Sequence, residues 1–270
     1  FELDSKDTFP KDELLILLEN IRFYDGEETC SQAFSKRLSS LADIYINEAF
    51  SAMHRRHASI VGLTEYLPSF IGKSASEEIS AIRGFLNTEK NSVAIIGGSK
   101  LETKLPVIEN LSKKYDKVLL GSLIGLELDG IISENIIVPK DFIVEKDGKI
   151  RTAGLNDNLK KEEVKDIGPK SIREYEKHIN SAQTIIWNGP LGKFEDERFA
   201  KGTTSIANAI ANSRAKKLAG GGDTIFFIKK MKLDKRFTYI STGGGALLEM
   251  LSGKELPGIT AVQGPSTKQR

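Results

Sequence analysis

SVAIIGGS, residues 92–99, decides the fold, because its apolar run breaks into two glycines and then restarts with helical spacing. The same pattern returns in AKKLAGGGD at residues 215–223 and in FTYISTGGG at residues 237–245. Each is typical of a buried parallel strand, a glycine turn and the first turn of a helix. Glycine lets the backbone approach a ligand closely, and the N–H groups of a helix N-terminus favour an anion. Three such units predict a multiply charged phosphate ligand at the carboxyl edge of one sheet.

Short apolar runs alternate with helically spaced apolar residues along the rest of the chain. Strands are expected at residues 14–18, 43–47, 93–96, 118–120, 135–138, 142–145 and 184–187. Helices are expected at residues 32–41, 75–86, 102–114 and 202–213, and from Pro169 onward after a polar loop. Strands that alternate with helices predict an α/β protein with a doubly wound, Rossmann-like parallel sheet.

The 270 residues are enough for two domains. We expect a partial α/β domain at residues 1–74, a connector helix and hinge at 75–90, a larger α/β domain at 91–255 and a C-terminal tail at 256–270. The connector is assigned because Ile79, Ile82 and Leu86 share one face of a helix that follows the turn-like LPSFIGKS.

The charge balance implies neither a nucleic-acid partner nor a membrane partner. Lys and Arg number 39 against 37 Asp and Glu, which gives a net charge of +2. No apolar run approaches the roughly 18 residues that span a bilayer, and we recognise no signal peptide. Cys30 is the single cysteine, which excludes an internal disulfide and fits a reducing compartment. We therefore expect a cytoplasmic protein.

Polar side chains that suit phosphate follow the glycine turns. Lys100 and Lys104 share a face if a helix starts at Ser99, although two solvated lysines explain the pattern equally well. Asp223 is either a helix cap or, beside bound phosphate, a ligand of Mg²⁺. No GxxxxGK(S/T) occurs and no GxGxxG opens a βαβ unit, which disfavours a P-loop nucleotidase and a dinucleotide dehydrogenase.

Six segments together resemble the phosphoglycerate kinase family and occur in the family's order. They are LLENIRF (17–23), ADIYINEAFSAMHRRHAS (42–59), IIGGSKLETK (95–104), WNGPLGKFE (187–195), GGGDT (220–224) and STGGGALLEMLSGKELPG (241–258). The resemblance implies an enzyme with an acid-substrate-binding domain at residues 1–74 and a nucleotide-binding domain at 91–255. It implies phosphoryl transfer between ATP and 3-phosphoglycerate, giving ADP and 1,3-bisphosphoglycerate in glycolysis and gluconeogenesis. A cytoplasmic monomer that uses Mg²⁺ is expected on the same basis.

The resemblance also implies roles for individual residues in the transfer step. Lys100 would hold the transferring phosphoryl group, which the backbone amides of Gly243, Gly244 and Gly245 would face. Arg55, in the HRRH segment, would bind the phosphate of the acid substrate, where a guanidinium engages two oxygens at once.

A further set of residues is expected to bind the nucleotide. Asp223 would hold the magnesium ion and Glu195 would contact the ribose hydroxyls. The phosphates would be contacted by Lys104, Asn188, Gly222 and Thr224.

The departures from the family's pattern leave two hypotheses open. The family's N-terminal aspartate–asparagine motif, catalytic arginine and histidine–arginine turn have no match, and neither does its GGGMA-like turn after Leu120. Glu48 stands where the family usually has Asp. The chain is therefore interpreted either as a phosphoglycerate kinase whose missing segments exist in a parent protein, or as a catalytically impaired nucleotide-binding module derived from that enzyme.

Overall fold

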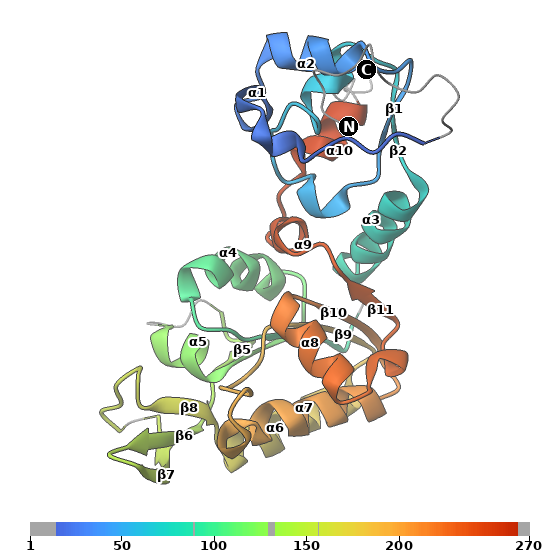
Figure 1. Ribbon diagram of the computed structural model, residues 1–270. Coiled ribbons are helices and arrows are strands. Elements are labelled where there is room, and N and C mark those ends of the chain that lie inside the picture. Colours follow the sequence, from blue (N-terminus) through green and yellow to red (C-terminus); the bar gives the residue numbers. More distant parts are fainter. Residues whose placement is uncertain (1–14, 89, 129–132, 156, 264–270) are drawn as a thin grey trace. The chain divides into compact units, whose positions relative to one another are not determined.

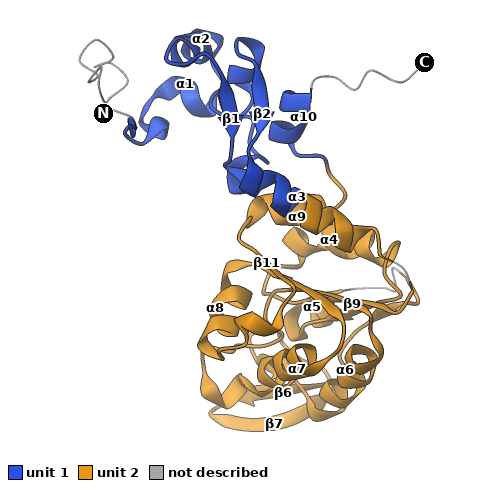
Figure 2. Ribbon diagram, turned by 90° about the vertical axis from the view of Figure 1, so that its right-hand side faces the viewer, with its two compact units in different colours: residues 1–79, 255–270 blue, residues 80–254 orange. Residues whose placement is uncertain are grey.

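The computed structural model describes residues 15–88, 90–128, 133–155 and 157–263 (Figure 1). The chain divides into two compact units, which Figure 2 distinguishes by colour. Unit 1 comprises residues 1–79 and 255–270, and unit 2 comprises residues 80–254. Helix α10 (Pro257–Gln263) belongs to unit 1, where the sequence predicted a separate tail. Among the described residues, no helix is both long and apolar enough to cross a membrane.

A parallel sheet forms the centre of unit 2. In the described part of the chain its strand order is β11-β10-β9-β3-β4-β5. The strands are β3 (Ser92–Ile96), β4 (Lys117–Leu120), β5 (Ile136–Ile137), β9 (Thr184–Asn188), β10 (Lys216–Gly220) and β11 (Tyr239–Ser241). The chain builds outward from β3 to β5 and then returns to the other side of β3 with β9. This reversal between β3 and β9 is the point at which open α/β sheets bind ligands, and it confirms the predicted doubly wound sheet.

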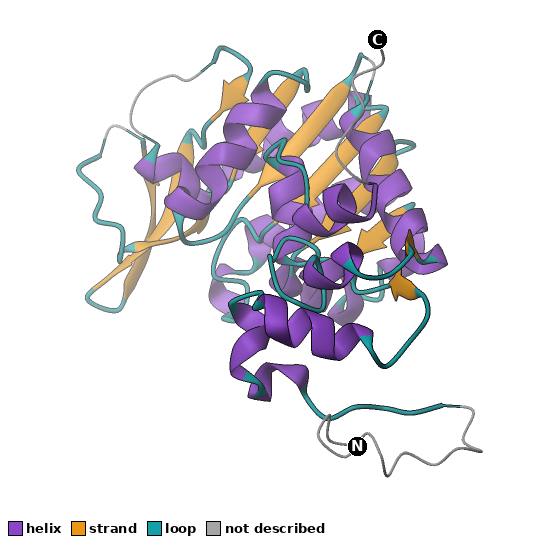
Figure 3. Ribbon diagram, turned by 90° about the horizontal axis from the view of Figure 1, so that it is seen from above, coloured by secondary structure: helices purple, strands orange, loops and turns teal. Residues whose placement is uncertain are grey.

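Helices cover both faces of this sheet (Figures 1 and 3). They are α4 (Leu101–Ser112), α5 (Ser122–Glu127), α6 (Pro169–Ser181), α7 (Lys201–Asn212), α8 (Gly222–Lys230) and α9 (Gly245–Leu251). The core that α6, α7 and α8 build with the sheet centres on Trp187 and Tyr175, both fully buried. The Tyr175 hydroxyl donates to the Leu120 carbonyl at 2.7 Å, which ties α6 to β4.

A small antiparallel sheet, in the order β7-β6-β8, occupies the region between β5 and α6. Its strands are β6 (Asp141–Lys146), β7 (Lys149–Gly154) and β8 (Val164–Ile167). The strand predicted at 142–145 is confirmed as β6. The expectation of a polar loop between this strand and Pro169 is wrong, because β7 and β8 lie in that segment. Strand β7 is exposed along most of its length, so it carries no apolar alternation by which a strand is recognised.

Unit 1 is built from short elements around a small core. Besides α10, its helical segments among the described residues include η2 (Ile21–Phe23), α1 (Asp25–Glu28), α2 (Gln32–Ser39), η3 (Phe50–Ala52) and η4 (Gly62–Glu65). Strands β1 (Tyr45–Asn47) and β2 (Ser69–Ile71) pair in parallel. One cluster of its buried apolar residues consists of Phe34, Leu38, Ala58 and Leu63. Residues 15–18 form no strand, contrary to the expectation for 14–18, whose first residue lies outside the described part.

A carboxylate caps the N-terminus of the connector helix. Helix α3 (Lys73–Leu86) contains the residue at which the two units divide, and it confirms the helix predicted at 75–86. The backbone N–H groups of Ser74 and Ala75 donate to the Glu48 carboxylate at 3.1 and 2.8 Å. An acidic side chain stabilises a helix N-terminus by accepting its unpaired N–H groups. Glu48 therefore caps α3.

Candidate nucleotide-binding site

Three turns at the carboxyl edge of the parallel sheet are hydrogen-bonded to one another. The Gly97 N–H donates to the Asn188 carbonyl at 2.9 Å, so the turn after β3 is held against the end of β9. The Gly189 N–H donates to the Thr224 hydroxyl at 2.8 Å, which holds β9 against the first turn of α8. These contacts confirm that the ends of β3, β9 and β10 meet at one edge.

Glycine is required at two of these turns for different reasons. A Cβ atom at Gly97 would overlap the carbonyl oxygens of Pro190 and Gly189, so only glycine permits the close approach of the two turns. Gly221 precedes α8 with φ of +96°, a conformation that residues with a Cβ rarely adopt. The glycines therefore shape the edge sterically, whether or not a ligand is bound.

A cavity of about 290 Å³ opens at this edge. Its lining includes seven of the residues expected to bind substrate: Lys100, Lys104, Asn188, Gly222, Asp223, Thr224 and Gly244. Two others, Gly243 and Gly245, are not among the lining residues. The Gly243 N–H donates to the Ser241 hydroxyl at 3.2 Å. Its amide is thus used within the turn, which differs from the expectation that it faces the phosphoryl group.

Lys104 and Asn188 form the polar centre of this cavity. The Lys104 ammonium donates to Asn188 Oδ1 at 2.5 Å, and Asn188 Nδ2 donates to the Gly220 carbonyl at 2.9 Å. Asn188 is 1% exposed and lies in register between Ile96 of β3 and Gly220 of β10. Burial lowers the pKa of Lys104, while the nearby Asp223 carboxylate opposes this effect. An anion placed beside the ammonium would favour its charged form further.

Lys100 differs from Lys104 in its setting. Helix α4 begins at Leu101, so Lys100 is its N-cap, in an extended conformation and exposed. The helix thus starts two residues after Ser99, the start on which the shared face of the two lysines depended, yet both lysines line the same cavity. A cation at a helix N-terminus opposes the helix dipole. An anion between the ammonium and the N-terminal N–H groups would relieve this repulsion.

A second cavity, of about 490 Å³, adjoins the first. The two share Gly98, Ser99, Pro190 and Asp223 in their linings. Glu195, expected at the ribose, lines the second cavity and is exposed. Apolar wall residues come from three elements: Leu123, Val164 and Leu191. Because the linings overlap, one extended ligand can place an anionic end in the first cavity and an apolar end in the second.

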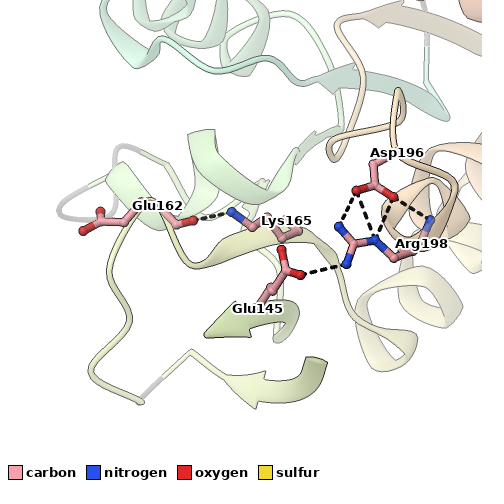
Figure 4. Close-up of polar contacts among 5 residues, drawn as sticks. All are labelled: Glu145, Glu162, Lys165, Asp196 and Arg198. Atoms are coloured by element: carbon pink, nitrogen blue, oxygen red, sulfur yellow. Dashed lines mark hydrogen bonds and ion pairs between the residues drawn. The ribbon is translucent and has the colours of Figure 1, made fainter. Parts of the chain in front are cut away.

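An arginine clasp, formed by Arg198, Asp196 and Glu145, lies near this second cavity (Figure 4). Arg198 donates to Asp196 Oδ2 at 2.7 Å and to Glu145 Oε1 at 2.8 Å. Hydrogen bonds from Arg198 hold the pKa of the Asp196 carboxyl below its usual range. The clasp joins the loop that carries Glu195 to β6 of the small sheet. Sequence reasoning missed it, because β6 and this loop are far apart in the chain.

Asp166 of β8 is a second residue that sequence reasoning missed. It is fully buried and accepts N–H groups from Gly202 at 2.5 Å and Ile167 at 2.9 Å. Burial raises its pKa to about 7, although both hydrogen bonds oppose the shift. Gly192, a lining residue of the second cavity, packs so closely on this carboxylate that a Cβ there would overlap it. Asp166 thus supports the cavity wall from behind.

The donor set at Asp223 fits a nucleotide-bound magnesium ion. The described residues contain no group of three or more His, Cys, Asp or Glu that could hold a metal by themselves. Mg²⁺ in phosphate-transfer sites is held by one or two carboxylates, with substrate phosphates and water as the remaining ligands. Asp223, at the first turn of α8 and in the lining of both cavities, supplies one such carboxylate.

Arg55, the residue expected to bind the acid substrate, lies in unit 1. It is half-buried in the turn that follows η3, where its N–H donates to the Ala52 carbonyl at 2.9 Å. The neighbouring segment is organised by Glu27, a buried carboxylate that sequence reasoning missed. Glu27 accepts the Ser59 N–H at 2.9 Å and the Ser59 hydroxyl at 2.5 Å, and His57 Nδ1 lies 3.6 Å from it.

Comparison with known proteins identifies the family. The family model described as phosphoglycerate kinase matches residues 5–128 and 126–254. Phosphoglycerate kinase of Leptospira biflexa serovar Patoc is 39% identical over 280 residues, covering 91% of this chain and 70% of the relative. That of Dictyoglomus turgidum is 40% identical, covering 92% and 71%.

Solved structures agree with the sequence comparisons. The structure of phosphoglycerate kinase from Coxiella burnetii matches with a TM-score of 0.80 and 34% identity, over 92% of this chain and 72% of that one. The enzyme from Pyrococcus horikoshii matches with a TM-score of 0.77 and 31% identity, over 91% and 72%. The chain therefore belongs to the phosphoglycerate kinase family, a family of phosphotransferases.

Proposed function

We propose that this protein catalyses reversible phosphoryl transfer between ATP and 3-phosphoglycerate, giving ADP and 1,3-bisphosphoglycerate, as a step of glycolysis and gluconeogenesis. One observation carries the proposal: two adjoining cavities lie at the switch point of a parallel sheet, one lined by lysines and glycines and the other walled in part by apolar side chains. This arrangement suits a nucleoside di- or triphosphate, and membership of the family supports this reaction.

Lys100, Lys104 and the glycine turns would supply positive charge and donors to the transferring group. Phosphoryl transfer needs positioning and charge neutralisation more than covalent chemistry, because its charge spreads over three equatorial oxygens. Lys100 would hold the phosphoryl group in transfer, together with backbone N–H groups near Gly244. Lys104 would bind the nucleotide phosphates from the opposite side of the turn, where Asn188 orients its ammonium.

The remaining contacts would orient the nucleotide. Asn188, Gly222 and Thr224 would contact its phosphates, and the Glu195 carboxylate would accept hydrogen bonds from the ribose hydroxyls. Asp223 would hold Mg²⁺, which when bound neutralises phosphate charge. The Thr224 hydroxyl accepts the Gly189 N–H and keeps its own hydrogen to donate to a phosphate oxygen.

We assign acid-substrate binding to unit 1 through Arg55. In a protein with both substrate sites, Arg55→Ala should raise the KM for 3-phosphoglycerate and leave the KM for ATP nearly unchanged. Arg55→Lys should recover part of the loss, because an ammonium is a point charge without the planar fork. The converse pattern, with the KM for ATP raised alone, would contradict the assignment. A monomeric state and a cytoplasmic location remain predictions from the sequence.

Calorimetry and a coupled assay test the proposal together. Lys100→Ala and Asp223→Ala should each weaken Mg·ADP binding about ten- to a hundredfold, since a charge-assisted phosphate contact contributes about 1.5–3 kcal/mol. Lys113→Ala, at the other end of α4, removes an exposed lysine outside both cavities and should leave binding unchanged. Unchanged binding in all three folded variants would refute the site. Binding of ADP without transfer to 3-phosphoglycerate would favour the impaired nucleotide-binding module instead.

A further inference from the structure

A short loop after β9, formed by Leu191, Gly192 and Lys193, lines the second cavity but not the first. We call these three residues the wall loop. Glu195, expected at the ribose, follows shortly after it and lines the same cavity. If nucleotide phosphates lie in the first cavity, as the proposed function requires, the wall loop lies beside the nucleoside half of the ligand. Its position then decides how well that half is held.

Hydrogen bonds from three elements hold the backbone of the wall loop. The Ser122 N–H of α5 donates to the Leu191 carbonyl at 2.8 Å, and the Lys193 N–H donates to a carbonyl of β8 at 2.7 Å. Both bonds join backbone atoms, so they do not depend on the side chains of the partners. The N–H groups of Leu191 and Gly192 donate instead to the Thr203 hydroxyl of α7, at 3.1 and 3.3 Å. Of these contacts, only the one to Thr203 is made by a side chain.

Thr203 is itself held firmly in place. It is fully buried in the first turn of α7 and lines neither cavity. Its hydroxyl oxygen has two lone pairs and can accept both N–H groups at once. The Gly202 N–H donates to the buried Asp166 carboxylate at 2.5 Å, which ties this turn of α7 to β8. Gly192 packs on the same carboxylate. The hydroxyl thus belongs to a turn that is anchored behind the wall loop.

We infer that Thr203 is a positioning residue for the nucleoside half of the nucleotide, because its hydroxyl fixes the wall loop and the start of the segment that carries Glu195. The inference deepens the proposed function and rests on it. Without the hydroxyl, two N–H groups lose their acceptor, and an unpaired N–H group is costly enough that the loop shifts to find water or another acceptor. The first cavity, which the wall loop does not line, keeps its shape.

The size of the effect follows from the number of bonds lost. A neutral hydrogen bond changes an equilibrium constant by about two- to tenfold. Thr203→Val keeps the branched shape of the side chain and removes the acceptor of two such bonds. The contacts to α5 and β8 remain and limit the shift of the wall loop. We therefore expect the dissociation constant of Mg·ADP to rise about tenfold.

Calorimetric titrations with Mg·ADP and Mg·pyrophosphate test this inference. Pyrophosphate has no nucleoside, so Thr203→Val should change its affinity by less than about twofold while weakening ADP about tenfold. A role of Thr203 in general stability alone would not change the ratio of the two affinities. Thr203→Ser retains the hydroxyl and should restore the affinity for ADP. Thr204→Val, the same change at the next residue of α7, is the matched control and should alter neither affinity.

The outcomes separate this inference from the proposed function. An unchanged affinity for ADP in Thr203→Val, or an equal loss for ADP and pyrophosphate, would overturn the inference and leave nucleotide binding established. Binding of ADP but not of pyrophosphate by the unmodified protein would also overturn it, because the two halves of the ligand would then not be recognised separately. Failure of both ligands to bind the folded, unmodified protein would overturn the proposed function.

Folding of each variant is checked by urea unfolding followed through Trp187, the only tryptophan in the sequence. If Thr203→Val does not fold, Thr203→Ala removes the same acceptor without adding a methyl group in place of the hydroxyl. The comparison with Thr203→Ser and with pyrophosphate is then made on that variant, and the same outcomes decide it.

Discussion

Replacing Asn188 by alanine should destabilise unit 2 by removing both side-chain hydrogen bonds that it makes with described residues. One joins Oδ1 to the Lys104 ammonium at 2.5 Å, and the other joins Nδ2 to the Gly220 carbonyl at 2.9 Å. A hydrogen bond to a charged group contributes about 1.5–3 kcal/mol and a neutral one about 1 kcal/mol. Water that enters the cavity will solvate part of the exposed ammonium. We therefore expect the free energy of unfolding to fall by about 2–3 kcal/mol.

Trp187 is a suitable probe for this experiment. It precedes Asn188 on β9, is fully buried, and its indole N–H donates to the Gly189 carbonyl at 2.9 Å. Urea unfolding followed by tryptophan fluorescence thus reports on the sheet that carries the site. Asn110→Ala is the matched control: it removes one neutral hydrogen bond, from Nδ2 to the Leu251 carbonyl at 2.8 Å. It should cost about 1 kcal/mol and leave the affinity for Mg·ADP unchanged.

Asn188→Asp separates hydrogen bonding from charge. The carboxylate still accepts from Lys104, but it has no hydrogen for Gly220 and adds a negative charge beside the expected phosphates. Its affinity for Mg·ADP should therefore fall further than that of Asn188→Ala. The reasoning is refuted if Asn188→Ala unfolds within about 0.5 kcal/mol of the unmodified protein, or if Asn188→Asp binds Mg·ADP as well as the unmodified protein does.

Three further predictions concern the supports of the site and of α3. Burial raises the pKa of Asp166 from 3.8 to about 7 in the folded state. Between these pH values the folded state retains a proton that the unfolded state has lost. The free energy of unfolding should therefore fall as pH rises through this range. Asp166→Asn should flatten this slope in urea titrations at pH 5 to about 8; an unchanged slope would contradict the assignment. Gly97→Ala should lower the melting temperature and weaken Mg·ADP binding, because the added Cβ overlaps the Pro190 carbonyl. Gly222→Ala should leave the melting temperature nearly unchanged, because its added Cβ meets no atom within 4 Å. Glu48→Ala should lower the free energy of unfolding by about 0.5–2 kcal/mol through loss of the α3 cap. If Glu48→Gln is as stable as the unmodified protein, the negative charge of Glu48 is not needed for capping.

The lysines and glycine turns that line the first cavity could be predicted from the sequence because their signals are local. A buried strand, a glycine turn and a helix start are recognised within ten residues, and parallel strands bring such turns to one edge without further information. Lys104 and Asn188 are 84 residues apart in the chain. Their contact nevertheless follows from the pairing of β3 with β9, which places Ile96 opposite Asn188.

The supports of the site could not be predicted, because they depend on contacts that leave no local pattern. The Arg198 clasp requires β6 to lie beside the loop after β9, and the two segments are 53 residues apart. Asp166 lies within a stretch that was interpreted as a polar loop. Its burial depends on the packing of Gly192 and Gly202 around it. Glu27 and Glu48 are ordinary charged residues until the fold places backbone N–H groups around them.

This difference has a functional consequence for the two ends of the nucleotide. In the proposed function the phosphates would face backbone turns and lysines whose positions follow from the strand–glycine–helix pattern, which favours an anion site. The base would lie toward β8, a strand on which Val164, Asp166 and Ile167 are buried, so packing limits the residues that can replace them. The phosphate end of the proposed site thus follows from a local sequence pattern, whereas the base end depends on tertiary packing.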